Sequence, residues 1–387
     1  MGINKNTLPV VKKFQLIRSE AERNLLERDE ELHLLLLALA SGLNILLLGP
    51  PGVAKSMLIR QVVSHIKNCD VFDFLMSKFT TPDEIFGPYS IKALEQDEYK
   101  RITTKRLPEA HIGYLDETFK SGGGNLNSLL EVMNERTFTN GTVKMKTPLI
   151  TIIGASNELP DEEDGLAALY DRFDIKRMVL PIQERTNQVK LALLPDPLPA
   201  ETFITFDDLN LANQEIKNVV MPEEMAEKLA ILRRDVEAAK IIITDRTYRR
   251  SIRLLQAEAW YHERDHVTEE DFEILQHAWW DDPKETRTLH SRILETTNPE
   301  KQELIDIFNE SMQSFKDIHD EQDIGKQMEK ASELRKKMGK TLKRIDVLLR
   351  EMKAKGKEVA DLEEMKSKIQ MEIAEVYKRV FNMSSDI

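Results

Sequence analysis

The sequence predicts an α/β fold built on a mainly parallel sheet, and three observations support this prediction. Short apolar runs alternate with helical stretches from about residue 18 to residue 180, which is typical of parallel strands covered by helices on both faces. The first run leads into a glycine-rich turn, and a later run ends in two carboxylates. The predicted strands are 43–48, 71–76, 111–115, 149–155 and 176–179.

Length and composition indicate a globular protein of two or three domains, with 387 residues and 41% hydrophobic content. The single cysteine, Cys69, excludes an internal disulfide framework and fits a reducing compartment, so we expect a cytoplasmic protein. The net charge of -12 disfavours sequence-independent nucleic-acid binding. Polar residues interrupt the apolar stretch at 32–48, which therefore indicates a helix at 30–40 followed by a strand, with no membrane span.

The turn after the first strand has the composition of a phosphate-binding loop. Its residues are Gly49, Pro50, Pro51, Gly52, Val53, Ala54, Lys55 and Ser56, followed by Met57. Backbone N–H groups and the start of the next helix can bind phosphate oxygens, the lysine can reach the outer phosphates, and Ser56 can bind Mg²⁺. The common pattern has glycine where this chain has Ala54, so we expect Ala54 to stay in the right-handed helical region. The alternative is an ordinary glycine-proline turn.

Polar residues follow two further predicted strands. Asp116 and Glu117 end the third, and Asn157 follows the fourth. Because ligands of open α/β sheets bind at the carboxyl ends of the strands, Asp116 is predicted to hold Mg²⁺ through water, and Glu117 to orient and deprotonate an attacking water. Asn157 can hold that water or the γ-phosphate, although asparagine is also a common structural residue of turns.

Other segments indicate insertions, a helical domain and a helical tail. The Asn140-Gly141 pair predicts a hairpin at 137–144, and a less certain one is expected at 89–102. The triple glycine at 122–124 is interpreted as a lead into a helix at 126–134. Further helices are predicted at 184–194, 223–238, 245–263 and 268–280, the last with a capping box. Two apolar stripes after residue 324 predict an antiparallel helical hairpin, which either docks on a partner or remains solvated.

The motifs, in this order, resemble those of AAA+ ATPases of the MoxR family, and especially its RavA-type branch. The resemblance covers about residues 14–282 and includes the sequences TTPDEIFGP at 80–88 and LYDRF at 169–173. It implies an AAA+ core at 1–182 with inserted hairpins and an all-α lid at 183–297. The resemblance does not extend to residues 298–387, where the dense charge and the apolar stripes predict a helical, coiled-coil-like tail. That branch carries a β-rich C-terminal domain, whereas only a charged helical tail is expected at that place in this chain, so the partners of the branch are not transferred.

The resemblance also implies a cofactor, an assembly and further site residues. ATP and Mg²⁺ are the expected cofactors, and a ring, with six subunits the expected number, is the expected assembly. Asn157 would be a sensor and Arg172 a finger supplied to a neighbouring subunit, because its planar, permanently charged fork can neutralise phosphate charge. Without the resemblance, Arg172 is a surface arginine beside Asp171. Arg246 resembles a second sensor that touches the γ-phosphate, with Arg249, Arg250 and Arg253 close by.

Two functions remain open at this point. The first is remodelling or assembly of a protein, with a von Willebrand A-type partner as the leading version. The second is a nucleic-acid-stimulated motor. A zinc protease is disfavoured although His262, Glu263 and His266 match the H-E-x-x-H pattern, because the predicted helix ends near Arg264 and separates the two histidines.

Overall fold

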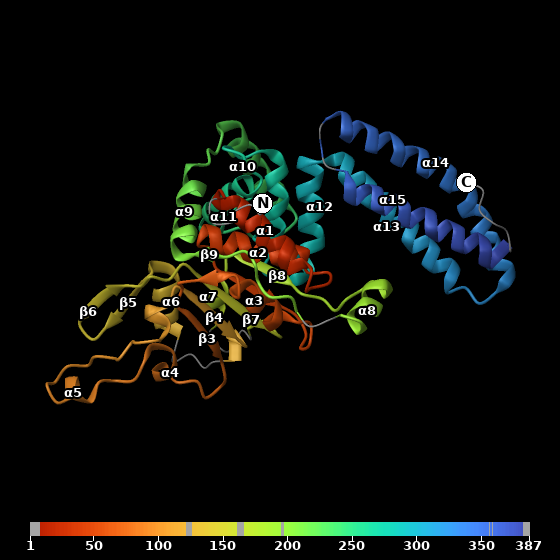
Figure 1. Ribbon diagram of the computed structural model, residues 1–387. Coiled ribbons are helices and arrows are strands. Elements are labelled where there is room, and N and C mark those ends of the chain that lie inside the picture. Colours follow the sequence, from red (N-terminus) through yellow and green to blue (C-terminus); the bar gives the residue numbers. More distant parts are fainter. Residues whose placement is uncertain are drawn as a thin grey trace, which may run out of the picture. The chain divides into compact units, whose positions relative to one another are not determined.

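A computed structural model describes residues 8–120, 126–160, 166–194, 197–355, 357 and 359–381 (Figure 1). The chain forms two compact units, residues 1–289 and residues 290–387. The triple glycine at 122–124 lies outside the described residues. No described helix is long and apolar enough to cross a membrane.

The first unit contains a five-stranded parallel sheet, as predicted. The strand order is β3-β4-β7-β1-β8, and β1 pairs in parallel with both β7 and β8. The central strands are buried along their whole length, which explains why they appear in the sequence as uninterrupted apolar runs. The strands are β1 (Ile45–Leu48), β3 (Val71–Leu75), β4 (Ile112–Asp116), β7 (Thr151–Ser156) and β8 (Ile175–Met178).

Helix α2 (Asp29–Ser41) lies between the sheet and the other helices of this unit. It contacts β1, β7 and β8 on one side and α1 (Val10–Glu22), α9 (Phe206–Asn218) and α11 (Asp245–Tyr261) on the other. Almost every residue from Leu32 to Ala40 is fully buried. A helix covered on all sides is apolar on all sides, so this stretch could resemble a membrane segment in the sequence.

The predicted hairpin at 137–144 is confirmed, and the second predicted hairpin is wrong. Strands β5 (Thr137–Asn140) and β6 (Val143–Lys146) pair in antiparallel fashion around Asn140-Gly141. Residues 89–102 instead form a loop that is closed by one bridge between Tyr89 and Arg101 and carries the short helix α5 (Ile91–Leu94). Pairing stops after this bridge because Ser90 caps α5 and turns the chain into a helix.

The remaining elements of the first unit are mainly helical, as predicted for the lid. The capping box of Thr268 and Asp271 is present, although the segment that it starts is a 3-10 helix. Sequence analysis missed α1 and α9. The other bounds are β2 (Ile66–Lys67), α3 (Lys55–Val63), α4 (Pro82–Phe86), α6 (Leu126–Glu135), α7 (Ala167–Tyr170), α8 (Arg185–Ala192), β9 (Ile204–Thr205), α10 (Glu223–Ala238), η6 (Glu269–His277) and α12 (Thr286–Thr297).

Beyond the end of α12, the described residues of the second unit form mainly a bundle of three long helices, where the sequence predicted two. Helices α14 (Ile324–Ala354) and α15 (Ala360–Val376) correspond to the two predicted stripes, and α13 (Pro299–His319) packs against both. Leu304, Phe315 and Ile318 of α13 belong to the same buried core as the stripe residues. The third helix therefore covers apolar surface that a two-helix hairpin would leave exposed.

Candidate nucleotide-binding site

The predicted phosphate loop connects the end of β1 to the start of α3. Gly49 has a φ of 154°, and a Cβ atom at this position would lie 2.2 Å from the carbonyl oxygen of Val179, so no other residue fits. Gly52 also has a positive φ, 83°. The loop therefore needs glycine at Gly49 and favours it at Gly52.

The expectation for Ala54 is wrong. Its φ of 68° and ψ of 23° are in the left-handed region, directly before the first residue of α3. This conformation costs an alanine about 1 kcal/mol or more, because its Cβ crowds the backbone. Ala54 thus adopts the left-handed backbone conformation that is easy for the glycine of the common pattern, at a cost in local strain.

Lys55 points back into its own loop. Its Nζ donates hydrogen bonds to the carbonyl oxygens of Gly49 (2.6 Å) and Pro50 (3.1 Å) and to Oδ1 of Asn157 (2.7 Å). Burial lowers the pKa of the ammonium group, although the carboxylates of Glu117 and Asp116 act in the opposite direction. Phosphate oxygens would offer this buried cation charged partners in place of neutral carbonyls.

The predicted magnesium ligands lie next to each other. The hydroxyl of Ser56 donates to Oδ2 of Asp116 (3.0 Å), while Oδ1 accepts from the N–H of Glu117 (3.0 Å). Among the described residues no group of three or more His, Cys, Asp or Glu side chains could hold a metal. One carboxylate and one hydroxyl fit Mg²⁺, which commonly takes few protein ligands and completes its shell with water and phosphate oxygens.

Glu117 and Asn157 are also in contact. Oε1 of Glu117 accepts a hydrogen bond of 2.5 Å from Nδ2 of Asn157, and Lys120 lies 3.3 Å from the same oxygen. Oε2 of Glu117 is buried without a hydrogen-bond partner. Such an orphaned acceptor fits a role in binding a water molecule, and Asn157 connects it to Lys55.

Sequence analysis missed a cleft of about 370 Å³ in the first unit. Arg28 lines it and also contacts the phosphate loop, because its guanidinium donates to the carbonyl oxygens of Val53 (3.2 Å) and Leu180 (2.7 Å). Lys176, Gln183 and Trp280 contribute further to the lining. These residues come from three distant segments, and nothing in the sequence indicates that they meet.

Arg172 lies at the opposite edge of the sheet from the phosphate loop. Its carbonyl oxygen accepts a hydrogen bond of 3.0 Å from Asn44, which precedes β1, whereas Gly49 follows β1. At roughly 3.3 Å per residue, the five steps from Asn44 to Gly49 correspond to about 16 Å. Its guanidinium pairs with Asp171, and its Nε is buried without a partner.

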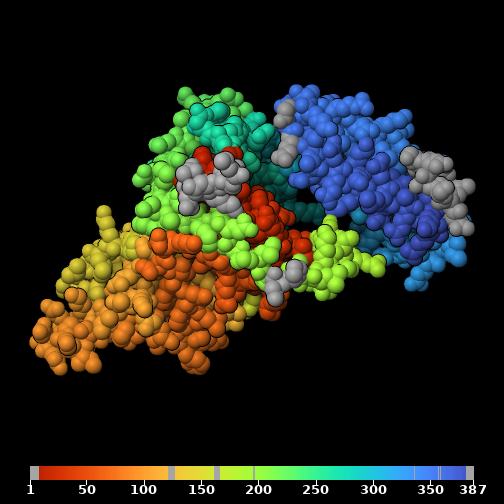
Figure 2. All heavy atoms as spheres, in the orientation of Figure 1, coloured from red at the N-terminus to blue at the C-terminus, as the bar shows by residue number. Residues whose placement is uncertain are grey.

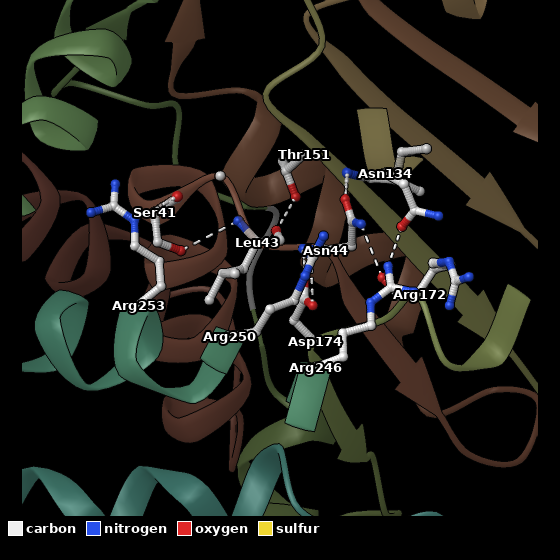
Figure 3. A network of polar contacts seen from close by, with 12 residues as sticks. Ser41, Leu43, Asn44, Asn134, Thr151, Arg172, Asp174, Arg246, Arg250 and Arg253 are labelled. Carbon is white, nitrogen blue, oxygen red and sulfur yellow. Dashed lines mark hydrogen bonds and ion pairs between the residues drawn. The ribbon is translucent and has the colours of Figure 1, made fainter. Parts of the chain in front are cut away.

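Arg246 lies beside Arg172 (Figure 3). Its guanidinium bonds to Asn134 and lies 3.5 Å from Asp171, so it does not reach the phosphate loop of its own chain. This placement contradicts the expectation that it touches a γ-phosphate bound to the same chain. Burial lowers its pKa, and the nearby cations Arg172 and Arg250 lower it further.

The other lid arginines differ in their contacts. Arg250 makes two hydrogen bonds of 2.7 Å to Asp174, and Arg253 donates to the carbonyl oxygens of Ser41 and Asn213. Arg249 is exposed. Arg250 therefore joins α11 to the residue before β8, and Arg253 joins α11 to α2 and α9. The carboxylate contact of Arg246, to Asp171, is longer at 3.5 Å, and Arg246 lies beside Arg172 (Figure 3).

The H-E-x-x-H pattern does not form a metal site. Helix α11 ends at Tyr261, and Glu263 has a φ of 60°, so the two histidines do not share a helix. His262 contacts Glu258, and His266 contacts Asp265. The zinc-protease interpretation is rejected on this geometry.

Three features define a P-loop nucleotide-binding protein of AAA+ architecture. They are the parallel sheet with this strand order, the glycine-dependent loop between β1 and α3, and the acidic residues at the end of β4. Comparison with known proteins agrees with this class. Residues 12–221 match the family model described as the MoxR domain in the MoxR-vWA-beta-propeller ternary systems, and residues 224–293 match an AAA lid domain. The chain belongs to the MoxR family of AAA+ ATPases.

Relatives and a solved structure are similar over most of the chain. Two uncharacterised proteins of Methanocaldococcus jannaschii are 39% and 36% identical over 77% and 79% of this chain, and the aligned regions cover 78% and 83% of those proteins. A crystal structure of a candidate ATPase from Cytophaga hutchinsonii has a TM-score of 0.60 at 19% identity, over 75% of this chain and 95% of that one. This last likeness concerns the fold alone.

Proposed function

We propose that this chain is a Mg²⁺-dependent ATPase whose hydrolysis site is completed by a second copy of the chain. The observation that carries the proposal is the division of its charged groups between the two edges of one sheet. Lys55, Ser56, Asp116, Glu117 and Asn157 lie at one edge, and Arg172 with Arg246 lies at the other. In a ring of identical subunits, a head-to-tail contact brings opposite edges of neighbours together.

Each residue at the carboxyl edge has a role that follows from its contacts. The loop amides and Lys55 bind the phosphates, and Ser56 and Asp116 hold Mg²⁺, which neutralises charge on the phosphate oxygens when it is bound. Glu117 accepts a proton from the attacking water through its unpaired Oε2, while Asn157 fixes its other oxygen. The water oxygen then bonds to the γ-phosphorus as the bond to the leaving ADP oxygen breaks.

The amino edge supplies the cations that one chain cannot bring to its own nucleotide. Arg172 would stabilise the phosphate charge of the neighbouring site, and Arg246 would assist from the same side. The Arg172 side chain is 19% exposed and its guanidinium pairs with the adjacent Asp171, so exchange of this carboxylate for a phosphate would keep the guanidinium paired with an anion. The cleft lined by Arg28 and Trp280 adjoins the loop and is the site that we assign to the nucleoside.

The biological role that we propose is remodelling or assembly of a protein partner by a ring, with six subunits as the expected number. The matched family is described in systems that also contain a von Willebrand A protein, which supports a partner of that kind. Membership of the RavA-type branch remains a proposal. The described part of the second unit is helical.

The replacement Glu117→Gln tests the assignment of the base. It keeps the size and hydrogen-bonding capacity of the side chain but removes its proton affinity, so ATP binding should persist while turnover falls by about 10² or more. Binding of a fluorescent ATP analogue and release of phosphate measure the two properties. Glu135→Gln is the matched control, because Glu135 is an exposed acid that pairs only with Lys144 among the contacts described. Undiminished turnover in Glu117→Gln would refute the assignment.

A further inference from the structure

Helix α14 of the second unit is strongly basic in a chain that is otherwise acidic. It contains ten basic and four acidic residues, whereas residues 1–289 carry a net charge of -11. Six of the ten basic residues lie in the run RKKMGKTLKR at 335–344, which contains no acidic residue. The net charge of the whole chain therefore hides a local concentration of cations in a separate compact unit.

The cations of α14 gather on the side of the helix that faces away from the bundle core. The apolar stripe of α14 belongs to the buried core of the three-helix bundle. Lys336, Lys340 and Lys343 are exposed, and their spacing of four and three residues places them on one face, which Arg350 continues seven residues further along. Figure 1 shows α14 along one side of the bundle, and the outer surface of this unit is blue in Figure 2. These four residues are here called the basic face.

The basic face differs from the edges of α14 in its ion pairs. At one edge, Arg344 pairs with Glu303 of α13 (2.6 Å), and Lys337 lies 3.6 Å from Glu310 of the same helix. Within the part of the chain that the structure describes, the side chains of the basic face form no ion pair or hydrogen bond. Like charges three and four residues apart repel each other, so a bound polyanion would stabilise this face.

Gly339 borders the basic face, three residues from Lys336 and next to Lys340. A Cβ atom at this position would meet no other atom within 4 Å, so packing does not require glycine here. Glycine in the interior of a helix lowers its stability relative to alanine. What this glycine does provide is a bare stretch of helix beside the lysines, which a ligand can approach closely.

The chemistry of the basic face decides between its possible partners. A membrane-bound helix inserts apolar side chains among the lipids, but those of α14 are used in the bundle core. Protein interfaces depend on central aromatic and arginine anchors and are depleted in lysine. Single-stranded nucleic acids are held by stacking of bases on aromatic side chains, and α14 contains no aromatic residue.

A duplex phosphate backbone needs only a row of cations, because lysine contacts to phosphates act through charge and read no sequence. From Lys336 to Arg350 the face is about 21 Å long at 1.5 Å per residue, which corresponds to about six base pairs at 3.4 Å each. We infer that the basic face of α14 binds the phosphate backbone of double-stranded nucleic acid independently of sequence. This inference goes beyond the proposed ATPase activity and does not depend on it.

A direct binding measurement tests the inference. The probe is a fluorescein-labelled DNA duplex of thirty base pairs and mixed sequence, and its anisotropy is followed as full-length chain is added at low salt without nucleotide. The logarithm of the affinity should fall with the logarithm of the salt concentration with a slope of about -3 or steeper, as expected for four phosphate contacts. The triple variant Lys336→Gln, Lys340→Gln and Lys343→Gln should bind at least tenfold more weakly and with a shallower salt dependence.

The matched control removes three basic residues of the same unit that pair with acids in the structure. They are Lys330, Lys353 and Lys355, each replaced by glutamine. Because the loss of charge is the same, the affinity of this variant for the duplex should stay within threefold of that of the unchanged chain. Replacing the three lysines of the basic face by arginine keeps their charge and should retain binding, which separates lost charge from lost structure.

Several results would overturn the inference. They are failure of the unchanged chain to bind the duplex, equal weakening by the two glutamine triples, or tighter binding of a thirty-residue oligothymidine than of the duplex. Tighter binding of labelled poly-L-glutamate, or of vesicles that contain phosphatidylserine, would assign the basic face to an acidic protein or to a membrane instead. Because binding is read without nucleotide, a chain that binds the duplex but does not hydrolyse ATP would refute the proposed function and leave this inference standing.

Discussion

The two edges of the five-stranded sheet carry different groups of charged and polar residues. At the carboxyl edge, Lys55, Asp116, Glu117 and Asn157 form a connected network around a phosphate loop. At the amino edge, about one strand length away, Arg172 is joined by an arginine from the lid. The comparison shows that about one strand length separates the two groups of residues, which is why we propose that a second copy of the chain completes the site.

The largest expected effect is a loss of ATP hydrolysis while nucleotide binding stays unchanged. Arg172→Ala should reduce ATP hydrolysis by about 10³, the lower range for an arginine that stabilises the phosphoryl-transfer transition state. Binding of ATP should be unchanged, because the phosphate loop belongs to the other edge. Phosphate release and analogue binding measure the two effects.

The control for this prediction is Arg172→Lys, which keeps the charge but loses the planar fork and should recover only part of the activity. Loss of ATP binding in Arg172→Ala would place the arginine in the carboxyl-edge site and would remove the contrast between the two edges.

A smaller effect is expected from the second arginine at the amino edge. Arg246→Ala should lower hydrolysis by about tenfold, the value of one charge-assisted hydrogen bond of about 1.5 kcal/mol. Arg249→Ala, which changes an exposed arginine on the same helix, should have no effect. Steady-state kinetics of both variants test this, and equal rates for the two would remove Arg246 from the proposed site.

The smallest effect concerns the stability of the phosphate loop. Ala54→Gly should relieve left-handed strain of about 1–2 kcal/mol but add flexibility to the unfolded chain worth about 0.5–1 kcal/mol. A net increase of about 0.5 kcal/mol in the free energy of unfolding should raise the thermal midpoint of the first unit by about 1 °C. Ala238→Gly, at an exposed right-handed position that ends α10, should lower the midpoint instead. Calorimetry distinguishes them, and a lower midpoint for Ala54→Gly would contradict the strain.

The sequence predicted the elements whose signals are local. Central parallel strands such as β1 and β7 are buried on both faces, so their apolar runs are continuous, and Asn140-Gly141 specifies its own turn. Helix α9 was missed because it buries only Leu209, Ala212 and Ile216, a narrow stripe among polar residues. Helix α5 was missed because it is a single turn that begins at the cap residue Ser90.

Site residues at the ends of strands were predictable from the sequence. Site residues whose position depends on how one helix packs against another were not. Residues that directly follow β1, β4 and β7 had to meet, because parallel strands end at one edge. The position of Arg246 depends on how α11 packs against α2, and the cleft beside Arg28 combines segments far apart in the chain. The backbone of Ala54 is imposed by closure of the loop, whereas alanine alone prefers the right-handed region.

Mixing two inactive variants tests the central claim most directly. Arg172→Ala leaves the carboxyl edge intact, and Lys55→Ala leaves the amino edge intact, so a mixed ring contains some interfaces with both complete halves. ATP hydrolysis by an equimolar mixture should clearly exceed the mean of the two variants measured separately. A mixture no more active than that mean, while native mass measurement shows that the two chains assemble together, would contradict a site shared between copies.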